Sequence, residues 1–398
     1  MFTRLYQSQK MGISWHLALC HILFESLPEK GQAAVTERME LPDLRAYIRQ
    51  IDVSEYAKSR NYIGGSTRLS EYISRGYISL PVVRDLILEN NTESSSFKLL
   101  SELSWREYWH HTWRVRGDEI FSYFRPLEHA PRQGIPTAIF NAETGVERLD
   151  TGIRQLYNTG FIDNHMRLWL AGLICNVAKC DWRIGAQWMH SYLIDGDYAS
   201  NYLSWQWVAG SYTGSPYLPH QDNINIYTKT NQLGTYLDKP YAEITAMNTP
   251  VELQDIATHL PPHNSSSITE TISLLEIQAA ETVLLYSPWT LDPSWRRDTA
   301  GSRVLVIPRE VFNKIAIHQN VTDSINSFAK MIPDLRIAYL SAQQLSTLRS
   351  NNIHRKDYPG IAHWPGVVDV AELLHPGLPQ TFYPSYSAYW KAIKQLQT

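Results

Sequence analysis

Cysteines are scarce in this sequence, which limits the metal and disulfide chemistry open to it. The 398 residues include only three, Cys20, Cys175 and Cys180. Three thiols cannot by themselves complete a four-cysteine zinc or iron–sulfur site. Nor do they form the pattern of a disulfide framework. We therefore predict no metal site, and we expect reduced thiols in a cytoplasmic protein.

Long apolar runs are also absent. No stretch has the roughly 20 apolar residues that a membrane-spanning helix needs. An apolar run at residues 13–24 follows Lys10 in the manner of a signal peptide, but His16 and His21 interrupt it and no small-residue cleavage site follows cleanly. We interpret this run as a buried helix and expect no membrane partner.

Charge of one sign is not in excess either. Lys and Arg together number 36 and Asp and Glu 39, so the formal net charge is −3. Such a protein is not held to nucleic acid by charge alone, although a local basic groove remains open. Aromatic residues, by contrast, are abundant, with 13 Trp and 23 Tyr. These rings suit stacking against a ring-bearing ligand, and a large aromatic core is the alternative that composition alone favours.

The hydrophobic pattern changes along the chain. Up to about residue 230 the apolar spacing is helical, as at Ile153, Leu156 and Tyr157. Between about 241 and 271 this periodicity fades into sequence rich in Pro, Ser and Asn, which indicates a connector. We predict a helical domain at residues 1–240, a connector at 241–271 and a second domain at 272–398.

The second domain is expected to be a small α/β unit. Three segments have the apolar composition of buried strands, at residues 282–287, 303–307 and 335–339. Helical patterns at 324–331 and 342–349 alternate with them, and a helix near 386–395 closes the chain. Such alternation predicts a parallel sheet. Because this part has neither a GxGxxG motif nor a P-loop, no nucleotide site is predicted there.

Residues 193–207 gather polar and aromatic groups that suit a heteroaromatic ligand. This segment contains the carboxylates Asp195 and Asp197, the amide Asn201 and the indoles Trp205 and Trp207. Carboxylates accept hydrogen bonds from ring N–H groups or ribose hydroxyls, and an amide can meet either kind of edge. A capped Asp-Gly-Asp turn followed by core tryptophans would explain any one of these residues, but not the whole set.

Five motifs resemble those of the DNA photolyase/cryptochrome family. The stretch LIDGDYASNYLSWQW at 193–207 resembles the family's DGDxAxNxxxWQW. TGFIDNHMR at 159–167 is similar to TGWxHNRxR, and DWR occurs at 181–183. ELSWRE at 102–107 resembles ELxWREF, and GSTRLS at 65–70 resembles GTSxLS. The motifs follow the family's order, which makes the resemblance far more specific than any single motif.

The resemblance, which extends over about residues 51–228, implies both a fold and an activity. The fold is mostly α, with an all-helical photolyase-type FAD-binding domain plus a small C-terminal α/β domain. The implied activity is that of a deoxyribodipyrimidine photo-lyase, which repairs cyclobutane pyrimidine dimers in DNA. In that family reduced FAD absorbs blue light and donates an electron to a flipped-out dimer, whose ring bonds then split.

The resemblance also assigns cofactor-binding roles. Arg167 and Asp195 would flank the flavin ring, Asp197 would take a proton donor of the flavin edge, and Asn201 would lie at N5. Arg106 would help to bind the diphosphate. The other residues implied to bind FAD are Tyr56, Ser66, Thr67, Arg68, Leu69, Ser70 and Asn164.

Catalytic roles follow from the same resemblance. Glu102, Trp105 and Trp207 would hold the dimer, with Asn201 as the fourth catalytic residue. Indole faces would stack the pyrimidines, and a Glu102 protonated by burial would donate a hydrogen bond to the dimer carbonyls.

The implied DNA-binding set adds Arg60 and His165 to the dimer-holding residues. The (6-4) repair enzymes of the family carry histidines where this chain has Asn164 and Leu168. This difference favours the cyclobutane dimer as the lesion.

Single motifs have plainer explanations, which stay open. The Gly-Ser-Thr motif could be an ordinary helix N-cap. Glu102 and Arg106 have the i,i+4 spacing of a surface ion pair. Trp105, Trp109 and Trp113 form a helical stripe that is more typical of a core.

The tryptophan chain that photoreduces the flavin in this family is incomplete here. Trp205 and Trp182 match two of its members, but Ile139 stands near the position expected for the third. Either another aromatic residue substitutes, Trp188 or Trp169, or photoreduction is weak. The two matching residues could also be plain core.

The order of the domains departs from the family. Most photolyases begin with an α/β antenna domain, whereas here an α/β segment follows the flavin-binding part. Residues 287–295 faintly resemble the opening of an antenna domain, but a packing cap is the preferred interpretation, and no antenna chromophore is predicted.

Because the net charge is −3 and His165 replaces an arginine usual in the family, we expect a monomer that prefers single-stranded or distorted damaged DNA. The alternative function is a cryptochrome-like blue-light photoreceptor that binds FAD without repair. Asn201 and Glu102 argue against it. A flavoprotein that kept the fold and lost the chemistry is the third possibility.

Overall fold

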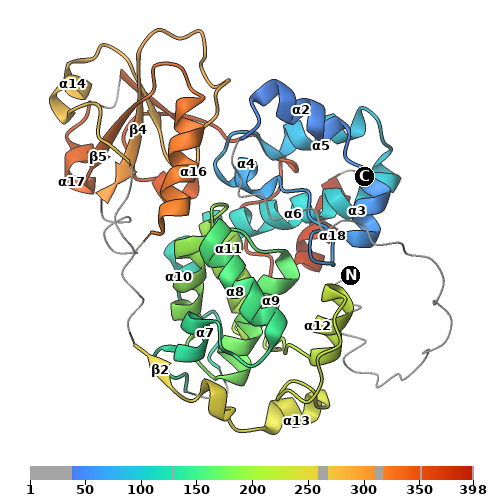
Figure 1. The fold of residues 1–398 in the computed structure, drawn as a ribbon. Helices are drawn as coiled ribbons and strands as arrows, with labels where there is room; N and C mark the ends of the chain where they lie inside the picture. The colour runs from blue at the N-terminus through green and yellow to red at the C-terminus, as the bar shows by residue number, and fades with distance from the viewer. Residues whose placement is uncertain (1–37, 128–129, 259–267, 310–316, 350–351, 397–398) are drawn as a thin grey trace.

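The computed structural model describes residues 38–127, 130–258, 268–309, 317–349 and 352–396. It combines many helices with one five-stranded parallel sheet (Figure 1), so the predicted fold class is confirmed. The helix expected at 13–24 and Cys20 lie outside the described residues. Within those residues, no helix combines the length and the apolar character needed to cross a bilayer, and Cys175 and Cys180 are buried free thiols.

The N-terminal half of the described chain is built from helices that each bury one face. The sequence explains several of their boundaries: Asp52, Thr92 and Asp181 accept hydrogen bonds from backbone N–H groups as N-caps. The principal helices are α2 (Leu41–Arg49), α3 (Val53–Ser59), α4 (Ser70–Ser74), α5 (Leu80–Leu88), α6 (Glu93–Arg116), α7 (Thr137–Asn141), α8 (Glu147–Thr159), α9 (Asn164–Gly172), α10 (Trp182–Tyr192), α11 (Tyr198–Ala209), α12 (Gln221–Thr228) and α13 (Tyr241–Ala246).

The centre of the helical part is formed by α8 to α11. The helix α9 runs directly into the short π-helical segment η2 (Leu173–Val177), as the helical spacing there predicted. Gly185 lets α10 and α11 approach closely, because a Cβ at this position would lie 2.4 Å from the ring of Trp205. The side chains of Trp169, Trp182 and Trp188 are fully buried in this core. Much of the aromatic content therefore serves packing.

The sheet forms the core of the C-terminal part, and its strand order is β5-β4-β3-β6-β7. Its strands are β3 (Val283–Tyr286), β4 (Ser302–Pro308), β5 (Arg336–Leu340), β6 (Ile353–Lys356) and β7 (Val367–Asp369). The three predicted strands are confirmed. Alternate residues of β3 face opposite sides, so Leu284 and Val283 belong to different apolar clusters. The strands β6 and β7 were missed, because they are short and carry charged or exposed side chains.

Helix α16 (Gln319–Lys330) lies between the sheet and the helical part (Figure 1). Its Ser324 hydroxyl donates to Glu71 at 2.6 Å, and Asn320 Nδ2 donates to the Tyr157 carbonyl at 3.1 Å. The other helices of this part, α14 (Leu274–Ala279) and α17 (Ala342–Ser346), both begin with a capping box. The alternation of helices and strands predicted from the sequence is thereby confirmed.

Two further pairings of elements cross the predicted division of the chain. The short strand β1 (Ile135–Pro136) pairs with β2 (Ile256–Ala257), which lies in the predicted connector. The closing helix α18 (Tyr386–Leu396) returns from the sheet to pack on α6 (Figure 1). The boundaries at 240 and 271 stay a prediction, and the C-terminal helix belongs spatially to the helical part.

Candidate functional site

Asp197 lies at the start of α11 and is held by the side chains of His110 and Arg106. Its Oδ1 accepts from the Ser200 N–H at 2.7 Å, which makes it the N-cap of the helix. Its Oδ2 lies 2.7 Å from His110 Nε2 and 3.4 Å from Arg106 Nη2. Burial alone would raise the pKa of Asp197, but His110 and Arg106 outweigh it and hold this pKa far below its usual value. Asp197 is therefore a buried anion that also caps a helix.

Asp195 and Arg167 form a second buried ion pair. Arg167 Nη2 donates to both carboxylate oxygens, at 2.8 and 3.1 Å, and its Nε donates to the Ile162 carbonyl at 2.9 Å. Burial pushes the pKa of Asp195 up, whereas Arg167 and the Ser70 hydroxyl push it down, and the net shift is downward. The two residues that the sequence placed beside a flavin ring are therefore in contact.

The loop before α4 approaches α3 so closely that glycine is required. A Cβ on Gly65 would lie 2.0 Å from the Ser59 carbonyl oxygen. Gly64, at φ 84°, donates its N–H to Asp163 Oδ2 at 3.1 Å. The other oxygen of Asp163 is buried and has no hydrogen-bond partner among the residues that the structure describes. This loop therefore leaves a carboxylate oxygen that can accept a ligand's donor.

The remaining residues expected at the cofactor differ in exposure. Ser66, Thr67, Ser70 and Tyr56 are partly buried, Arg68 and Asn164 are exposed, and Leu69 is buried. Arg68 adopts φ 58°, and its guanidinium lies 3.8 Å from the centroid of the Phe161 ring. Helix α4 has only five residues, so hydroxyl and guanidinium groups are the main anion-binding groups of this loop.

Arg106 and Glu102 do not form the surface pair that their spacing allows. Arg106 donates to the Ser74 hydroxyl at 2.7 Å and contacts Asp197, whereas Glu102 Oε1 lies 3.7 Å from Arg60 Nε. The i,i+4 explanation is therefore wrong. Both residues of α6 instead contact elements outside their own helix.

A cavity of about 600 Å³ brings together the three residues expected to hold the lesion. Glu102, Trp105 and Trp207 all line it. The Glu102 side chain is 38% exposed, and desolvation by its surroundings raises the pKa of its carboxyl, although Arg60 opposes this shift. The lining also includes Phe97, Lys98, Trp109, Leu168, Tyr217, Tyr386 and Trp390. The cavity is large enough for a pair of nucleobases and is mainly aromatic.

One face of Trp105 is covered by a residue from the far end of the chain. Tyr386 of α18 stacks on it with ring centroids 4.1 Å apart and planes 14° apart. Trp105 is partly exposed, whereas Trp109 and Trp113 are 7% and 5% exposed. The core explanation of the tryptophan stripe therefore holds for Trp109 and Trp113, while Trp105 lines the cavity.

Two residues expected to contact DNA offer little surface. The Arg60 side chain is 6% exposed and bonds to the Ala57 carbonyl as well as contacting Glu102. His165 is also 6% exposed; its Nδ1 lies 2.8 Å from the Asn61 carbonyl, and its ring stacks on Tyr227. Burial lowers the pKa of His165. Their DNA-binding roles stay predictions: His165 lines the cavity, whereas Arg60 contacts its lining residue Glu102.

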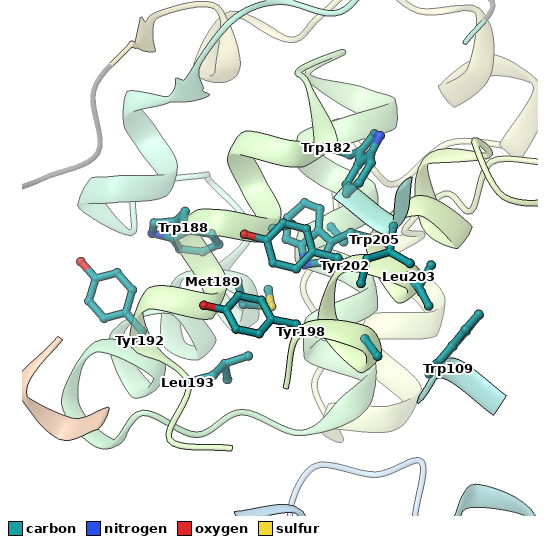
Figure 2. Packing of buried hydrophobic residues seen from close by; sticks show 14 of the residues in the cluster. Trp109, Trp182, Trp188, Met189, Tyr192, Leu193, Tyr198, Tyr202, Leu203 and Trp205 are labelled. Atoms are coloured by element: carbon teal, nitrogen blue, oxygen red, sulfur yellow. The ribbon is translucent and has the colours of Figure 1, made fainter. Parts of the chain in front are cut away.

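Asn201 and Trp205 of α11 point into the helical core. Asn201 is 9% exposed and donates its Nδ2 to the Ala186 carbonyl at 2.9 Å. Trp205 is 2% exposed and packs on Gly185. Figure 2 shows Trp205 beside Tyr202, with Trp182 and Trp188 on different sides of this cluster.

A row of aromatic rings leads outward from Trp182. Its ring lies 5.7 Å from that of Tyr123, edge to face, and Tyr123 is partly exposed. Burial and the Asp181 carboxylate raise the pKa of the Tyr123 phenol. The two substitutes considered from the sequence lie elsewhere: Trp188 donates to Tyr157 and Trp169 to Asn223. Tyr123 is thus a partly exposed ring in contact with Trp182.

A second cavity, of about 500 Å³, lies where the sheet meets α4 and α6. The segments that follow β3 and β6 line it, and the strand order reverses between these two strands. Six of its charged groups form the pairs Lys356–Asp292, Arg114–Asp357 and Arg296–Asp369. Arg106 and Asp197 line this cavity as well. The sequence did not predict this cavity.

Comparison with known proteins identifies part of the chain. Residues 99–269 match the family model described as the FAD binding domain of DNA photolyase. Over this segment the chain is similar to that family. FAD is accordingly the cofactor of the domain.

Two curated relatives match at about 30% identity. A deoxyribodipyrimidine photo-lyase of Alkalihalophilus pseudofirmus is 30% identical over 228 residues, covering 54% of this chain and 47% of that protein. A cryptochrome DASH of Danio rerio is 32% identical over 171 residues, covering 40% of this chain and 32% of that protein. A solved cryptochrome of Synechocystis sp. PCC6803 is 23% identical, with a TM-score of 0.44 over 56% of this chain and 49% of that one. The chain thus spans about half the length, or less, of these relatives.

The side chains present in the photolyase-type domain fit FAD by their chemistry. Arg106 and Arg68 offer cationic groups for a diphosphate, together with the hydroxyls of the 64–70 loop. The unpartnered Asp163 oxygen and the Asp195 carboxylate are acceptors for ribose or ring donors. Asp197 already has four partners, Ser200, His110, Arg106 and the Tyr358 hydroxyl, so it has less capacity for the flavin edge than the family motif implies.

Four residues of the site were missed from the sequence. His110 lies one helical turn from Arg106 on α6, and that i,i+4 spacing was the available signal. Asp163 stands inside the recognised TGFIDNHMR motif. Tyr123 and Tyr386 have no local signal, because they reach the site only through long-range packing.

Proposed function

We propose that this chain repairs cyclobutane pyrimidine dimers in DNA under light. The observation that carries the proposal is the cavity of about 600 Å³ shared by Glu102, Trp105 and Trp207 next to a photolyase-type FAD-binding domain. Relatives named photo-lyase support the same chemistry. Bound FAD supplies a light-driven one-electron transfer, and the protein supplies the geometry.

Glu102 is proposed as the hydrogen-bond donor to the lesion. Its raised pKa favours the protonated carboxyl, which can donate to a dimer carbonyl. Trp207 and the accessible edge of Trp105 then bound the pyrimidine rings with apolar surface. Removing the dimer from water strengthens the Glu102 hydrogen bond, because the local dielectric falls.

The buried ion pairs are proposed to hold the cofactor. Arg167 places a fixed cation beside Asp195, and this cation favours the negatively charged form of a neighbouring ring. Ser66, Thr67, Ser70 and Arg106 are proposed at the diphosphate. Asn201 is proposed at the flavin edge, with its Nδ2 held by the Ala186 carbonyl.

Electron supply to the cofactor is proposed to run through Trp205, Trp182 and Tyr123. When Tyr123 loses an electron, its phenolic proton passes to the neighbouring Asp181 carboxylate and on to water, because an oxidised phenol is a strong acid. A small external thiol returns one electron and one proton to the tyrosyl radical. The contact between Trp182 and Tyr123 supports this order.

A cryptochrome-like photoreceptor is the second candidate. Tyr386 covers one face of Trp105, and the covered face is unavailable to a pyrimidine. This specific observation favours the photoreceptor function. A relative named cryptochrome DASH is consistent with either function.

The deciding experiment uses chemically reduced, FAD-loaded protein and an oligonucleotide with one thymine dimer, as single strand and as duplex. Reduction beforehand removes any dependence on the electron-supply path. Light-dependent loss of the dimer, abolished in Trp207→Ala and retained in Trp289→Phe, supports repair. An FAD-loaded protein that leaves both substrates intact under light contradicts it and favours the photoreceptor. Faster repair of the single strand supports the expected preference for unpaired DNA.

A further inference from the structure

Helix α18 is a fixed wall of the lesion cavity. Its Tyr389 is 1% exposed and donates its hydroxyl to Glu107 at 3.3 Å, and Ile393 is 2% exposed. These two side chains anchor the helix on α6 in the core. Burial of Tyr389 and Ile393 therefore makes displacement of α18 costly, and the residues on its other face are a permanent part of the cavity.

The other face of α18 presents two aromatic rings one helical turn apart. Tyr386 lies between Trp105, at 4.1 Å, and Trp390, at 6.1 Å with planes 22° apart. The Trp390 ring in turn contacts Phe97 edge to face at 6.1 Å. Phe97 is 47% exposed, and all four residues line the same cavity. The rings thus form a continuous row from the interior of the cavity to its outer edge.

A cation lies at the exposed end of this row. Lys98 Nζ is 5.8 Å from the Phe97 ring centroid, and Lys98 lines the cavity. Aromatic rings next to a positive charge are the combination that binds single-stranded nucleic acid, because the rings stack on bases and the cation contacts the backbone. A base within a duplex already has neighbours on both faces, so only an unpaired or extruded base can use such a row.

We propose that Phe97, Trp390 and Lys98 form a binding strip for the unpaired nucleotides that flank the lesion, with Tyr386 closing the strip against Trp105. The lesion itself enters the same cavity between Glu102 and Trp207. This inference rests on the proposed function for the identity of the lesion, but the strip binds undamaged single-stranded DNA as well. The strip gives the predicted single-strand preference a structural origin that does not depend on net charge.

The test measures binding in the dark, with the full FAD-loaded chain and an undamaged oligothymidine of about 12 nucleotides, single-stranded or paired with oligoadenosine. Phe97→Ala and Trp390→Ala are expected to weaken single-strand binding by about 5- to 100-fold, as for the loss of one base stack. Trp390→Phe should retain most of the affinity. Duplex binding should change by less than about twofold in all three variants.

Leu275→Ala is the matched control, because Leu275 is 76% exposed on α14 and does not line the cavity. Phe97 is half exposed, so Phe97→Ala is not expected to disturb folding, and a loss of binding in this variant reports on the strip. Unchanged single-strand affinity in both alanine variants overturns the proposal. Tighter binding by Tyr386→Ala or Trp390→Ala also overturns it, because α18 would then exclude DNA from the cavity.

The outcome is separable from that of the repair experiment. Weaker single-strand binding by the variants of a protein that repairs nothing supports the strip and contradicts repair. Repair by a protein whose variants bind normally contradicts the strip alone.

Discussion

The imidazole Nε2 of His110 lies 2.7 Å from Oδ2 of Asp197, at the start of helix α11. The Asp197 side chain is 1% exposed and that of His110 is 19% exposed. This contact joins α6 to α11 through a buried anion. The contact is specific to the tertiary structure, because the two residues are far apart in the sequence.

Removal of His110 is expected to destabilise the protein. His110→Ala leaves Asp197 with Arg106 as its remaining cationic partner, at a cost of roughly 2 kcal/mol, which lies below the value for a fully buried pair because His110 is partly exposed. Asp197 has a lowered pKa in the folded state, so its contribution is present above the ordinary Asp pKa of about 4 and is lost as the pH falls through the lowered value. The stability gap between wild type and variant should therefore be full at pH 7 and shrink in strong acid. Denaturant unfolding measures it, with the exposed His363→Ala as control, and equal stabilities at pH 7 would contradict the prediction.

The folded protein is expected to lose stability between neutral and mildly acidic pH. Burial and the nearby Arg75 lower the pKa of His190 to about 4, and its Nδ1 is buried without a hydrogen-bond partner. Below about pH 6.5, His190 therefore binds a proton in the unfolded chain but stays neutral in the folded chain. The free energy of unfolding consequently falls as the pH drops toward the lowered pKa. At pH 5 this costs up to about 2 kcal/mol.

His190→Gln should reduce the dependence of folding stability on pH, and thermal unfolding at several pH values measures this dependence. A residual slope is expected, because burial also lowers the pKa of His375 to about 4. A variant with the same pH dependence as wild type would contradict the lowered pKa, because His190 would then titrate alike in the folded and unfolded states.

Repair, where present, should decline as the pH rises through the raised pKa of Glu102. The raised pKa of Glu102 means that the protonated donor is present below this pKa and lost as the pH rises through it. Glu102→Gln keeps a neutral donor, so its repair rate should be independent of this titration. Glu102→Ala should lower repair about tenfold, as for the loss of one hydrogen bond to a buried acceptor. Dimer loss at a series of pH values measures both, with the exposed Glu89→Gln as control.

Photoreduction should depend on Tyr123 rather than on Trp188 or on Tyr157, which bonds to Trp188. Tyr123→Phe keeps the ring contact with Trp182 but removes the phenolic proton that makes oxidation irreversible. Accumulation of reduced cofactor under light with a thiol should slow strongly, while repair by chemically reduced protein stays unchanged. Tyr157→Phe is the matched control, since Tyr157 bonds to Trp188. Equal slowing in both variants would remove the assignment of Tyr123 as the outer donor.

Local sequence patterns were sufficient where the structure depends on neighbouring residues. The helical spacing at Ile153 and Leu156 predicted α8, and the β-branched run at 303–307 predicted β4. The strands β6 and β7 escaped prediction because they lie toward one edge of the sheet, where short, partly charged strands are stable through pairing alone. The contact between Arg167 and Asp195 followed from two motifs of one family, which already carry tertiary information.

By itself, the sequence determined the fold class and the similarity of residues 99–269 to a photolyase FAD-binding domain. Only the tertiary structure decided which groups meet. In the folded chain Arg106 pairs with Asp197 and not with Glu102. Tyr386 stacks on Trp105, although 281 positions of sequence separate them. The physical reason is that periodicity and capping act over a few residues, whereas stacking and buried ion pairs form wherever packing brings their partners together.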